Sequence, residues 1–352
     1  MDRPAPRWLP GGHLQTIWPA LWARRVTGAP IAYQRERWAT PDGDFVDVDW
    51  LDDARPSAGA SNVQGGAHPA QQAPAPAVKP APKPLLVLFH GLEGSSRSHY
   101  AEAFADWARA QDIGFAVPHF RGCSGAINLA PRAYHCGDFA EVGWMLQRFH
   151  AVQQARGGGP LMAVGISLGG NALMRWAAEA GEQAARTVQA VAAVCAPLDM
   201  VAGGHAMGRG LNRQIYTRMF MRTLKAKARA KLAQHPGLFD PQRLAAACDL
   251  YAFDDLFTAP LHGFAGVQDY WRRASAKPHL GAVRVPALVL NARNDPFVPA
   301  ASLPRADEVG RHVTLWQPAH GGHVGFCQGR VPGDVRGLPA AVGAWLMKAS
   351  GA

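Results

Sequence analysis

One stretch of the sequence, Leu161-Met-Ala-Val-Gly-Ile-Ser167-Leu-Gly-Gly170, constrains the fold more than any other. An apolar run typical of a buried strand passes directly into Gly-x-Ser-x-Gly, and a helix-like sequence follows from Asn171 to Ala180. A serine on such a sharp turn takes a strained backbone conformation, which is tolerated because the glycines two residues to either side lack clashing side chains. Since the chain has 38 glycines, the pattern alone is weak evidence. The strand before it and the helix after it predict a turn that lifts the Ser167 hydroxyl clear of a sheet.

Strand-like and helix-like segments alternate along most of the chain. We expect helices at 98–111, 138–154 and 338–347, and strands at 113–119 and 161–165. Alternation of this kind predicts an α/β protein with a mostly parallel central sheet and helices on both of its faces.

Two other segments shape the expected domain organisation. Residues 36–51 predict an antiparallel hairpin with its turn at Pro41-Asp-Gly43. Residues 54–84 are rich in Ala, Pro, Gly and Gln, which predicts a disordered insertion between strands and not a domain boundary. The 352 residues are then expected to form a single domain, 1–352, with a helical cap and connecting segment at roughly 199–280.

Nucleophilic chemistry at a serine needs a base that takes its proton and a third group that orients the base. The apolar run 285–291 predicts a strand that leads to Asp295, and the short strand 312–316 leads to His323. Serine, then acid, then histidine is the order of the α/β-hydrolase fold. Taken singly, Asp295 before a proline resembles an ordinary turn residue. The joint order nevertheless predicts Ser167, Asp295 and His323 as a catalytic triad.

Other residues compete with these or support them. His320 lies on the same loop as His323, and we favour His323 because glycines flank it. The strand-like run 84–89 leads to His90-Gly91, so the backbone amides of Leu92 and Leu168 are predicted to form the oxyanion hole. His90 is expected to brace this loop. Cys123, which follows a strand end, is expected to structure its loop, because the sequence places no base beside it.

Charge is concentrated in one segment of the chain. The formal net charge is +10, yet Met200 to Phe239 holds eight Lys and Arg residues and no acid. Arg218, Arg222, Lys225 and Arg229 share one helical face, opposite a face with Ile215, Tyr216, Met219, Phe220 and Leu224. Lys227 and Lys231 break this pattern, so a helix end or bend is expected near Lys225. The segment reads as an amphipathic cap helix or as a surface for anionic lipid or acidic substrate, and no nucleic-acid partner is expected.

The remaining composition limits the class of protein. No run reaches the length of a membrane span, and the N-terminal residues show no apolar signal core, so we expect a cytoplasmic protein. The five cysteines are scattered and show no Cys-x-x-Cys, which predicts reduced thiols. Histidines and cysteines are not paired at ligand spacing, so we expect neither a metal nor a cofactor.

Several motifs in register resemble those of the YheT-like α/β-hydrolases. They are Gly11–Thr16, His90–Ser95, Arg121–Gly125, Gly165–Gly170 and Gly321–Phe326, with Gly263-Phe264, Asp269-Tyr270, Ser275, Val285-Pro286 and Asn294-Asp295. The resemblance covers nearly the whole chain from about Trp8. It implies the same triad and a role for Gly11–Thr16 in shaping the site. Two departures are the long 54–84 segment and Trp271, where the family usually carries tyrosine.

Three hypotheses about function follow. The first is a serine carboxylester hydrolase for short- to medium-chain acyl esters, acylglycerols among them. The second is an acyltransferase or ester synthase with the same triad, in which an alcohol replaces water. The third is a membrane-surface binding module that uses the basic cap, against which the intact triad argues. A haloalkane dehalogenase is disfavoured because its nucleophile would be an aspartate at position 167. The oligomeric state is left open by the sequence.

Overall fold

The protein is described by a computed structural model that covers residues 5–51 and 83–352. Within these residues, eight strands form one sheet in the order β1-β2-β4-β3-β5-β6-β7-β8. Strands β1 and β2 form an antiparallel hairpin, and β2 pairs antiparallel with β4, whereas all other neighbours are parallel. The predicted α/β fold with a mostly parallel sheet is therefore confirmed. Residues 54–82 of the expected insertion lie outside the described part of the chain.

The strands fall close to the expected positions. They are β1 (Tyr33–Ala39), β2 (Phe45–Leu51), β3 (Leu85–Phe89), β4 (Gly114–Pro118), β5 (Leu161–Ile166), β6 (Ala190–Val194), β7 (Ala287–Leu290) and β8 (Val313–Trp316). The hairpin turn forms at Pro41–Gly43 as predicted, with Thr40 N donating to Asp44 O at 2.9 Å and Gly43 N to Thr40 O at 3.0 Å. Strands β3 to β7 are buried throughout, because helices cover both faces of the sheet.

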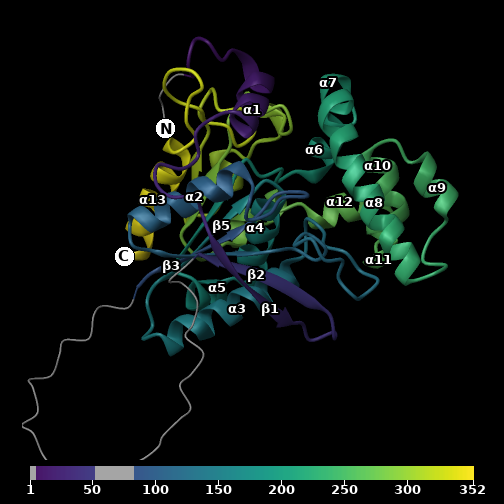
Figure 1. Ribbon diagram of the computed structural model, residues 1–352, viewed down its shortest axis with the longest axis horizontal. Helices are drawn as coiled ribbons and strands as arrows, with labels where there is room; N and C mark the ends of the chain where they lie inside the picture. Colours follow the sequence, from purple (N-terminus) through teal and green to yellow (C-terminus); the bar gives the residue numbers. More distant parts are fainter. Residues whose placement is uncertain (1–4, 52–82) are drawn as a thin grey trace, which may run out of the picture.

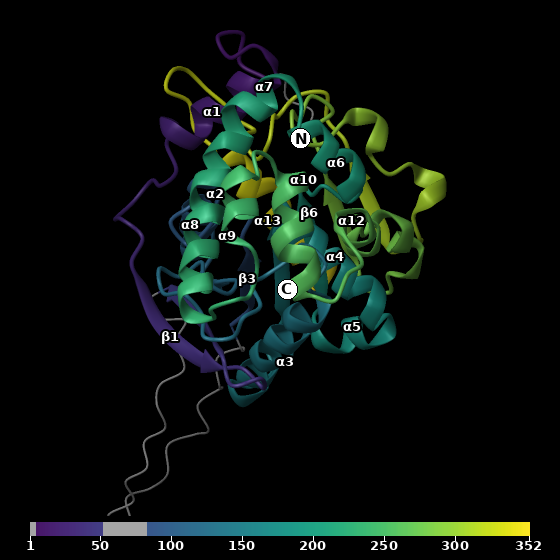
Figure 2. The ribbon, with the colours of Figure 1, turned by 90° about the vertical axis from the view of Figure 1, so that its right-hand side faces the viewer.

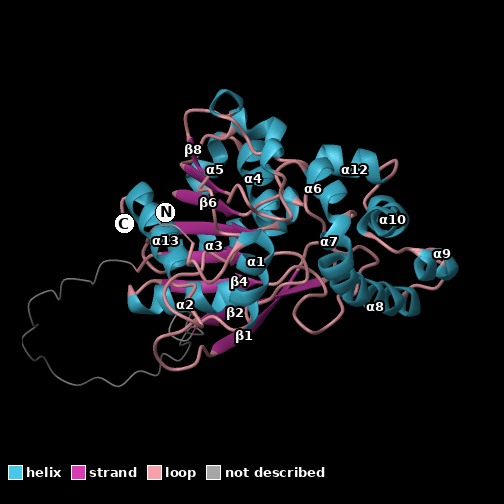
Figure 3. Cartoon of the chain, turned by 90° about the horizontal axis from the view of Figure 1, so that it is seen from above, coloured by secondary structure: helices cyan, strands magenta, loops and turns pink. Residues whose placement is uncertain are grey.

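Two groups of helices sandwich the sheet (Figures 1 and 3). On one face lie α2 (His99–Ala110) and α13 (Gly337–Ser350), and on the other lie α3 (Phe139–Ala155), α4 (Leu168–Ala180) and α5 (Glu182–Thr187). Side chains alternate along each strand: Leu86 and Leu88 of β3 join the core with α2 and α13, whereas Val87 joins the core with α3 and α4. The N-terminal helix α1 (Gly11–Leu21) lies at one end of this sandwich, near α7 (Figure 2).

Between β6 and β7 the chain leaves the sheet and forms a helical segment, which we call the insert (residues 199–280). Figure 2 shows it in front of the sheet. Its helices are α6 (Met200–Met207), α7 (Gly210–Asn212), α8 (Arg218–Gln234), α9 (Pro241–Ala246), α10 (Leu250–Phe253), α11 (Ala259–Leu261) and α12 (Val267–Ala274). Residues 213–217 and 254–258 form π-helical turns. The insert has its own small core around Leu244, Phe253 and Phe257.

Two details of the insert differ from the sequence analysis. Helix α8 does not end or bend near Lys225 but continues to Gln234, because Lys227 and Lys231 turn toward the core loops and find polar partners there. Ile215 and Met219 are 40% and 53% exposed instead of buried with Leu224. The π-helical turn at 213–217 explains this, since it shifts the faces that a regular period of 100° per residue would assign. No helix in the described ranges is long and apolar enough to span a membrane.

Candidate active site

Ser167 occupies the turn between β5 and α4 with φ 53° and ψ −119°, a left-handed conformation that costs a non-glycine residue free energy. The two flanking glycines of the motif are required sterically. A Cβ on Gly165 would lie 2.4 Å from the Gly169 oxygen, and one on Gly169 would lie 2.5 Å from the His90 oxygen. Ser167 N donates to Val194 O at 2.8 Å, which fixes the turn to β6. The sequence pattern thus produces the predicted strained turn.

The structure brings the three predicted residues together. His323 Nε2 lies 2.9 Å from Ser167 Oγ, and His323 Nδ1 lies 2.8 Å from Asp295 Oδ2. In this arrangement the Nδ1–H donates to the carboxylate, which leaves Nε2 free to accept the serine proton. The other carboxylate oxygen of Asp295 accepts from Phe297 N at 2.8 Å, and the Phe297 ring stacks on the His323 ring with centroids 4.0 Å apart. The imidazole is therefore held both in its plane and across its face.

Helix α1 positions the loops that carry the acid and the histidine. Gln15 Oε1 accepts from Asn294 Nδ2 at 2.9 Å and from Gly321 N at 3.0 Å, so one side chain joins both loops. Thr16 Oγ1 accepts from His323 N at 2.8 Å. Helix α1 and the histidine loop approach each other closely, since a Cβ on Gly325 would lie 1.8 Å from the backbone carbonyl oxygen of Gln15. Reasoning from the residues alone did not find this role of Gln15 and Thr16, and only the family resemblance pointed to the segment.

The two predicted oxyanion donors lie beside Ser167. Leu92 follows β3, Leu168 opens α4, and both residues line the same cavity as Ser167. Neither backbone amide has a hydrogen-bond partner within the described part of the chain, so both remain available to a ligand oxygen. Two unpaired amides, one at the start of α4 and one from the loop after β3, are the arrangement that stabilises a developing negative charge.

The cavity at Ser167 is mostly apolar and encloses about 80 Å³. The insert supplies much of its wall, and Phe297 adds a ring from the acid loop. A second cavity of about 100 Å³ adjoins it, with Leu92, Leu168, Met200, Leu250 and Asp254 lining both. Asp254 accepts hydrogen bonds from Thr258 Oγ1 at 2.7 Å and Trp271 Nε1 at 2.9 Å. Burial raises the pKa of this carboxyl to about 6.

The competing residues occupy different surroundings. His320 is exposed and lies 3.5 Å from Asn294 Nδ2, whereas His323 is buried and reaches Ser167. His90 Nδ1 lies 2.8 Å from Gly91 O, and its Nε2 accepts from Phe120 N at 3.1 Å, which fits the expected bracing of the loop. Burial lowers the pKa of His90 to about 3. Burial likewise raises the pKa of the Cys123 thiol to about 11, which disfavours a reactive thiolate.

One group of side chains has the composition of a metal site. The donor atoms of Cys195, Asp295 and His323 lie within 4.8 Å of one another. Hydrogen bonds explain why these side chains lie together without a metal ion. His323 and Asp295 bond to each other, and Cys195 Sγ accepts from Val324 N at 3.2 Å. Burial, followed by the nearby Asp295 charge, raises the pKa of the Cys195 thiol well above its ordinary value. A neutral thiol is a poor metal ligand.

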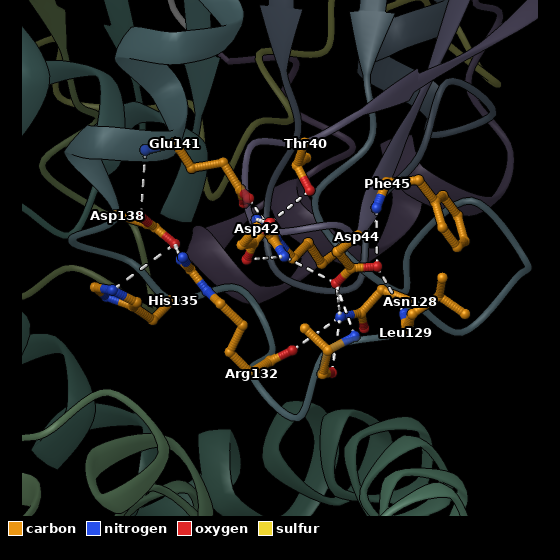
Figure 4. A network of polar contacts seen from close by, with 12 residues as sticks. Thr40, Asp42, Asp44, Phe45, Asn128, Leu129, Arg132, His135, Asp138 and Glu141 are labelled. Atoms are coloured by element: carbon orange, nitrogen blue, oxygen red, sulfur yellow. Dashed lines mark hydrogen bonds and ion pairs between the residues drawn. The ribbon is translucent and has the colours of Figure 1, made fainter.

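The insert is attached to the core by two lysines of α8. Lys227 Nζ donates to Glu93 Oε1 at 2.7 Å, directly after the predicted oxyanion residue Leu92. Lys231 is buried and its Nζ donates to Asn128 O and Ala130 O, the latter at 2.6 Å. The loop with Asn128 is itself bound to Asp44, which accepts from Asn128 Nδ2 and Leu129 N at 2.6 Å each (Figure 4). The position of the insert over the cavity is thus coupled to the loops after β3 and β4.

A family model described as the alpha/beta hydrolase fold matches residues 84–329. YheT of Escherichia coli (strain K12), an esterase by name, is 36% identical over 336 residues, which cover 95% of this chain and 89% of YheT. Phospholipase ABHD3 of Mus musculus is 24% identical over 330 residues, 90% of this chain and 75% of the relative.

Solved structures agree on the fold. The Pyrococcus furiosus esterase Pf2001 has a TM-score of 0.51 at 14% identity, and the match covers 93% of this chain and 98% of Pf2001. The chain therefore belongs to the α/β-hydrolase fold family. Within that family it is a YheT-like protein, which confirms the resemblance carried by the sequence motifs.

Proposed function

We propose that this protein is a serine carboxylester hydrolase that acts on short- to medium-chain acyl esters through an acyl-enzyme. The observation that carries this proposal is the hydrogen-bonded series Ser167 Oγ, His323 Nε2, His323 Nδ1 and Asp295 Oδ2, with distances of 2.9 Å and 2.8 Å. The names of the relatives, esterase and phospholipase, agree with ester cleavage.

Each residue has a defined role in the proposed reaction. His323 takes the Ser167 proton as the serine oxygen attacks the ester carbonyl carbon. Asp295 holds the imidazole in the required tautomer and stabilises the imidazolium that forms. His323 then gives the proton to the leaving alcohol, and a water activated by the same histidine cleaves the acyl-enzyme.

The carbonyl oxygen becomes negatively charged in the tetrahedral intermediate. The unpartnered amides of Leu92 and Leu168 are the donors proposed to stabilise it. Each such donor contributes about 3 kcal/mol to the transition state. Because the Leu92 loop also carries Glu93, the ion pair with Lys227 ties the oxyanion site to the position of the insert.

The two adjoining cavities are the proposed acyl site. Their volumes, about 80 and 100 Å³, and their largely apolar lining suit an acyl chain of limited length. The insert supplies much of this lining, so we propose that residues 199–280 act as the cap that sets chain-length preference.

The alternative is an acyltransferase, in which an alcohol resolves the acyl-enzyme in place of water. The apolar cavity favours it, because an apolar alcohol would partition into a site that water enters poorly. Hydrolysis and alcoholysis share every step up to the acyl-enzyme, so only the products separate them.

We further propose that the insert contacts lipid surfaces peripherally. Leu211, Ile215 and Met219 are 60%, 40% and 53% exposed, and the exposed cations Arg218 and Arg222 lie beside Met219 in the first turns of α8. Exposed apolar side chains next to cations are typical of interfacial helices that bind anionic lipid. Co-sedimentation with anionic vesicles tests this contact, and binding equal to that of neutral vesicles would contradict it.

The test of the main proposal is hydrolysis of p-nitrophenyl esters with acyl chains of increasing length, with and without added ethanol. We expect activity with short and medium chains and a loss of about 10⁴-fold or more in Ser167→Ala, since the triad acts as a unit. Ser95→Ala is the matched control. Ethyl ester in place of free acid would favour the transferase, and equal activity of wild type and Ser167→Ala would overturn both.

A further inference from the structure

A separate cleft lies where the start of α3 meets α4 and the end of the insert. It encloses about 640 Å³, and its floor is formed by residues 137–140 and by Arg175 of α4. Of the described residues that line it, Arg132, Arg175 and Arg273 are cations, whereas Asp138 supplies a carboxylate. The lining thus holds three cations and one carboxylate, and Arg273 also pairs with Asp269 outside the lining at 3.3 Å. The reaction proposed at Ser167 makes no use of this cleft.

Arg175 is the least satisfied of these cations. The residue is only 7% exposed, and neither Nε nor Nη1 has a hydrogen-bond partner among the described residues. Its Nη2 lies 3.4 Å from Oε2 of the half-exposed Glu179, and its guanidinium lies 5.2 Å from the Phe139 ring centroid. Burial lowers the pKa of this arginine. A buried guanidinium with unpaired N–H groups costs free energy, which calls for a compensating ligand.

Two other residues that line the cleft, Arg132 and His262, also have a buried side-chain nitrogen without a hydrogen-bond partner among the described residues. Arg132 pairs with Asp138 through Nη2, but its buried Nε has no partner in the described ranges (Figure 4). His262 likewise has a buried Nε2 without one, and its ring lies 4.3 Å from that of His135. Three N–H groups of Arg132 and Arg175 are thus left without acceptors, around a single lining carboxylate that is already paired. Burial lowers the pKa of His262 to about 3, so its ring is neutral; it donates to the Ala133 carbonyl, and its Nε2 is an acceptor and not a donor.

We propose that this cleft is a binding site for a phosphate group, with Arg175 as its central contact and Arg132 beside it. A phosphate presents three or more acceptor oxygens and up to two charges, which matches several convergent donors better than a carboxylate with two oxygens. The cleft volume exceeds that of an inorganic ion, so the ligand is an organic phosphate. The unpaired Nε and Nη1 of Arg175 are buried, so the proposed site requires the guanidinium to rotate toward the cleft when the phosphate binds.

The site is close to the proposed acyl cavity without being part of it. His135 lines both this cleft and the cavity of about 100 Å³ that adjoins the Ser167 cavity. Asn171, four residues after Ser167 on α4, donates to Cys136 O and Ala274 O at 2.8 Å each, so the nucleophile helix is bonded to both walls. The phosphate site stands independently of hydrolysis, since it needs none of the three triad residues.

The experiment is calorimetric titration of the full chain at pH 7.5 with glycerol 3-phosphate and with inorganic phosphate. We expect saturable binding to wild type and to Ser167→Ala, and at least about tenfold weaker binding to Arg175→Met, because charged hydrogen bonds are lost. Arg186→Met, an exposed arginine on the neighbouring helix α5, is the matched control and should bind like wild type. Equal affinity of Arg175→Met and wild type would overturn the proposal.

A stability measurement separates a binding role from a structural one. Without ligand, Arg175→Met should be at least as stable as wild type, because it removes a buried guanidinium whose N–H groups are unpaired. A clear loss of stability would make Arg175 a structural residue and contradict the proposal.

Vesicles identify the source of the phosphate. Binding to vesicles with phosphatidate that is lost in Arg175→Met and competed by glycerol 3-phosphate supports a lipid headgroup. Binding of soluble glycerol 3-phosphate without such competition supports a soluble organic phosphate. Absence of binding to every probe at 10 mM, about a hundredfold above a typical ligand affinity for such a site, would overturn the site itself.

Discussion

The Ser167 turn and the insert are built in different ways. At the turn, backbone geometry fixes each reacting group: β5 and β6 hold Ser167, while Gln15 and Thr16 of α1 bind the loops of Asp295 and His323. The insert has its own small core, and it is joined to the rest of the protein both by apolar packing, in which Tyr270 and Trp271 enter the main core, and by the polar contacts of Lys227 and Lys231. The difference implies that the chemistry depends on the loops at the carboxyl ends of the strands, and that substrate selectivity depends on the insert. Variants at the Ser167 turn and its neighbouring loops should therefore lose turnover, whereas variants in the insert should lose stability or substrate selectivity.

The largest effect that sharpens this comparison is expected at the acid. Asp295→Asn keeps the size of the side chain but presents an amide to His323 Nδ1, which favours the wrong tautomer. We expect kcat to fall about 10⁴-fold with little change in KM. Steady-state kinetics on the best p-nitrophenyl ester measures this. The neighbouring Asn294→Asp is unsuitable as a control because Asn294 also bonds the histidine loop, so Asp307→Asn, an exposed acid, serves instead.

A smaller effect is expected where α1 supports the site. Gln15→Ala removes the oxygen that accepts from Asn294 and Gly321, so both loops lose a shared contact. We expect kcat to fall about tenfold, since misplacement of catalytic groups is costly, with KM nearly constant. Leu14→Ala, at a 47% exposed position of the same helix, should behave like wild type. A KM effect alone would show that Gln15 acts on binding and not on geometry.

At the insert, the expected change is in stability. Lys231→Met leaves Asn128 O without its buried donor, so the free energy of unfolding should fall by about 1–3 kcal/mol in a urea titration. Arg229→Met, an exposed cation on the same helix, should change it by less than about 0.5 kcal/mol. If both variants unfold alike, the contact of Lys231 with the core contributes nothing to the attachment of the insert.

The last comparison concerns pH and the buried histidines of both regions. Burial lowers the pKa of His90 to about 3 and of His99 to about 4 at the core, and of His135 to about 4 and His262 to about 3 at the insert boundary. Their unfolded pKa is near 6.5, so the unfolded chain binds more protons below that pH. Stability should therefore be full above pH 6.5 and decline as the pH falls toward 4.

Two buried acids oppose this trend in part. Burial raises the pKa of Asp254 to about 6, and burial followed by the Asp138 charge raises the pKa of Glu141, so the folded state binds their protons first and gains stability as the pH falls. Four histidines outnumber these two acids, which leaves a net loss. Urea unfolding at pH 7.5, 6 and 4.5 measures the slope, and an unchanged or rising stability would show that these histidines are protonated in the folded state.

The residues at the carboxyl ends of the strands were predicted well from the sequence, because short-range sequence patterns determine the backbone there. Gly-x-Ser-x-Gly demands glycines for reasons of van der Waals contact, and apolar runs bounded by turns place Asp295 and His323 at strand ends. Leu92 and Leu168 followed from the same rules. Their catalytic roles remain predictions, although Leu92, Ser167 and Leu168 line one cavity and hydrogen bonds join Ser167 to His323 and His323 to Asp295.

The insert was harder to predict because its contacts are long-range. Lys227 and Lys231 looked like breaks in an amphipathic pattern, yet their partners Glu93 and Ala130 lie more than 100 residues away in sequence. A π-helical turn shifted Ile215 and Met219 to the surface, which a fixed helical period does not foresee. The same holds for Arg175, whose sequence neighbours give no sign of the cleft formed with the end of the insert.

The central claim is that Ser167 is an activated nucleophile. Intact-protein mass spectrometry after treatment with a fluorophosphonate, followed by peptide mapping, tests it most directly. The account predicts one adduct on Ser167, absent in Ser167→Ala and strongly slowed in His323→Ala, while Ser95→Ala reacts like wild type. Folded protein that forms no adduct, or an adduct on another residue, would contradict the account and leave the insert and its surfaces as the functional part of the molecule.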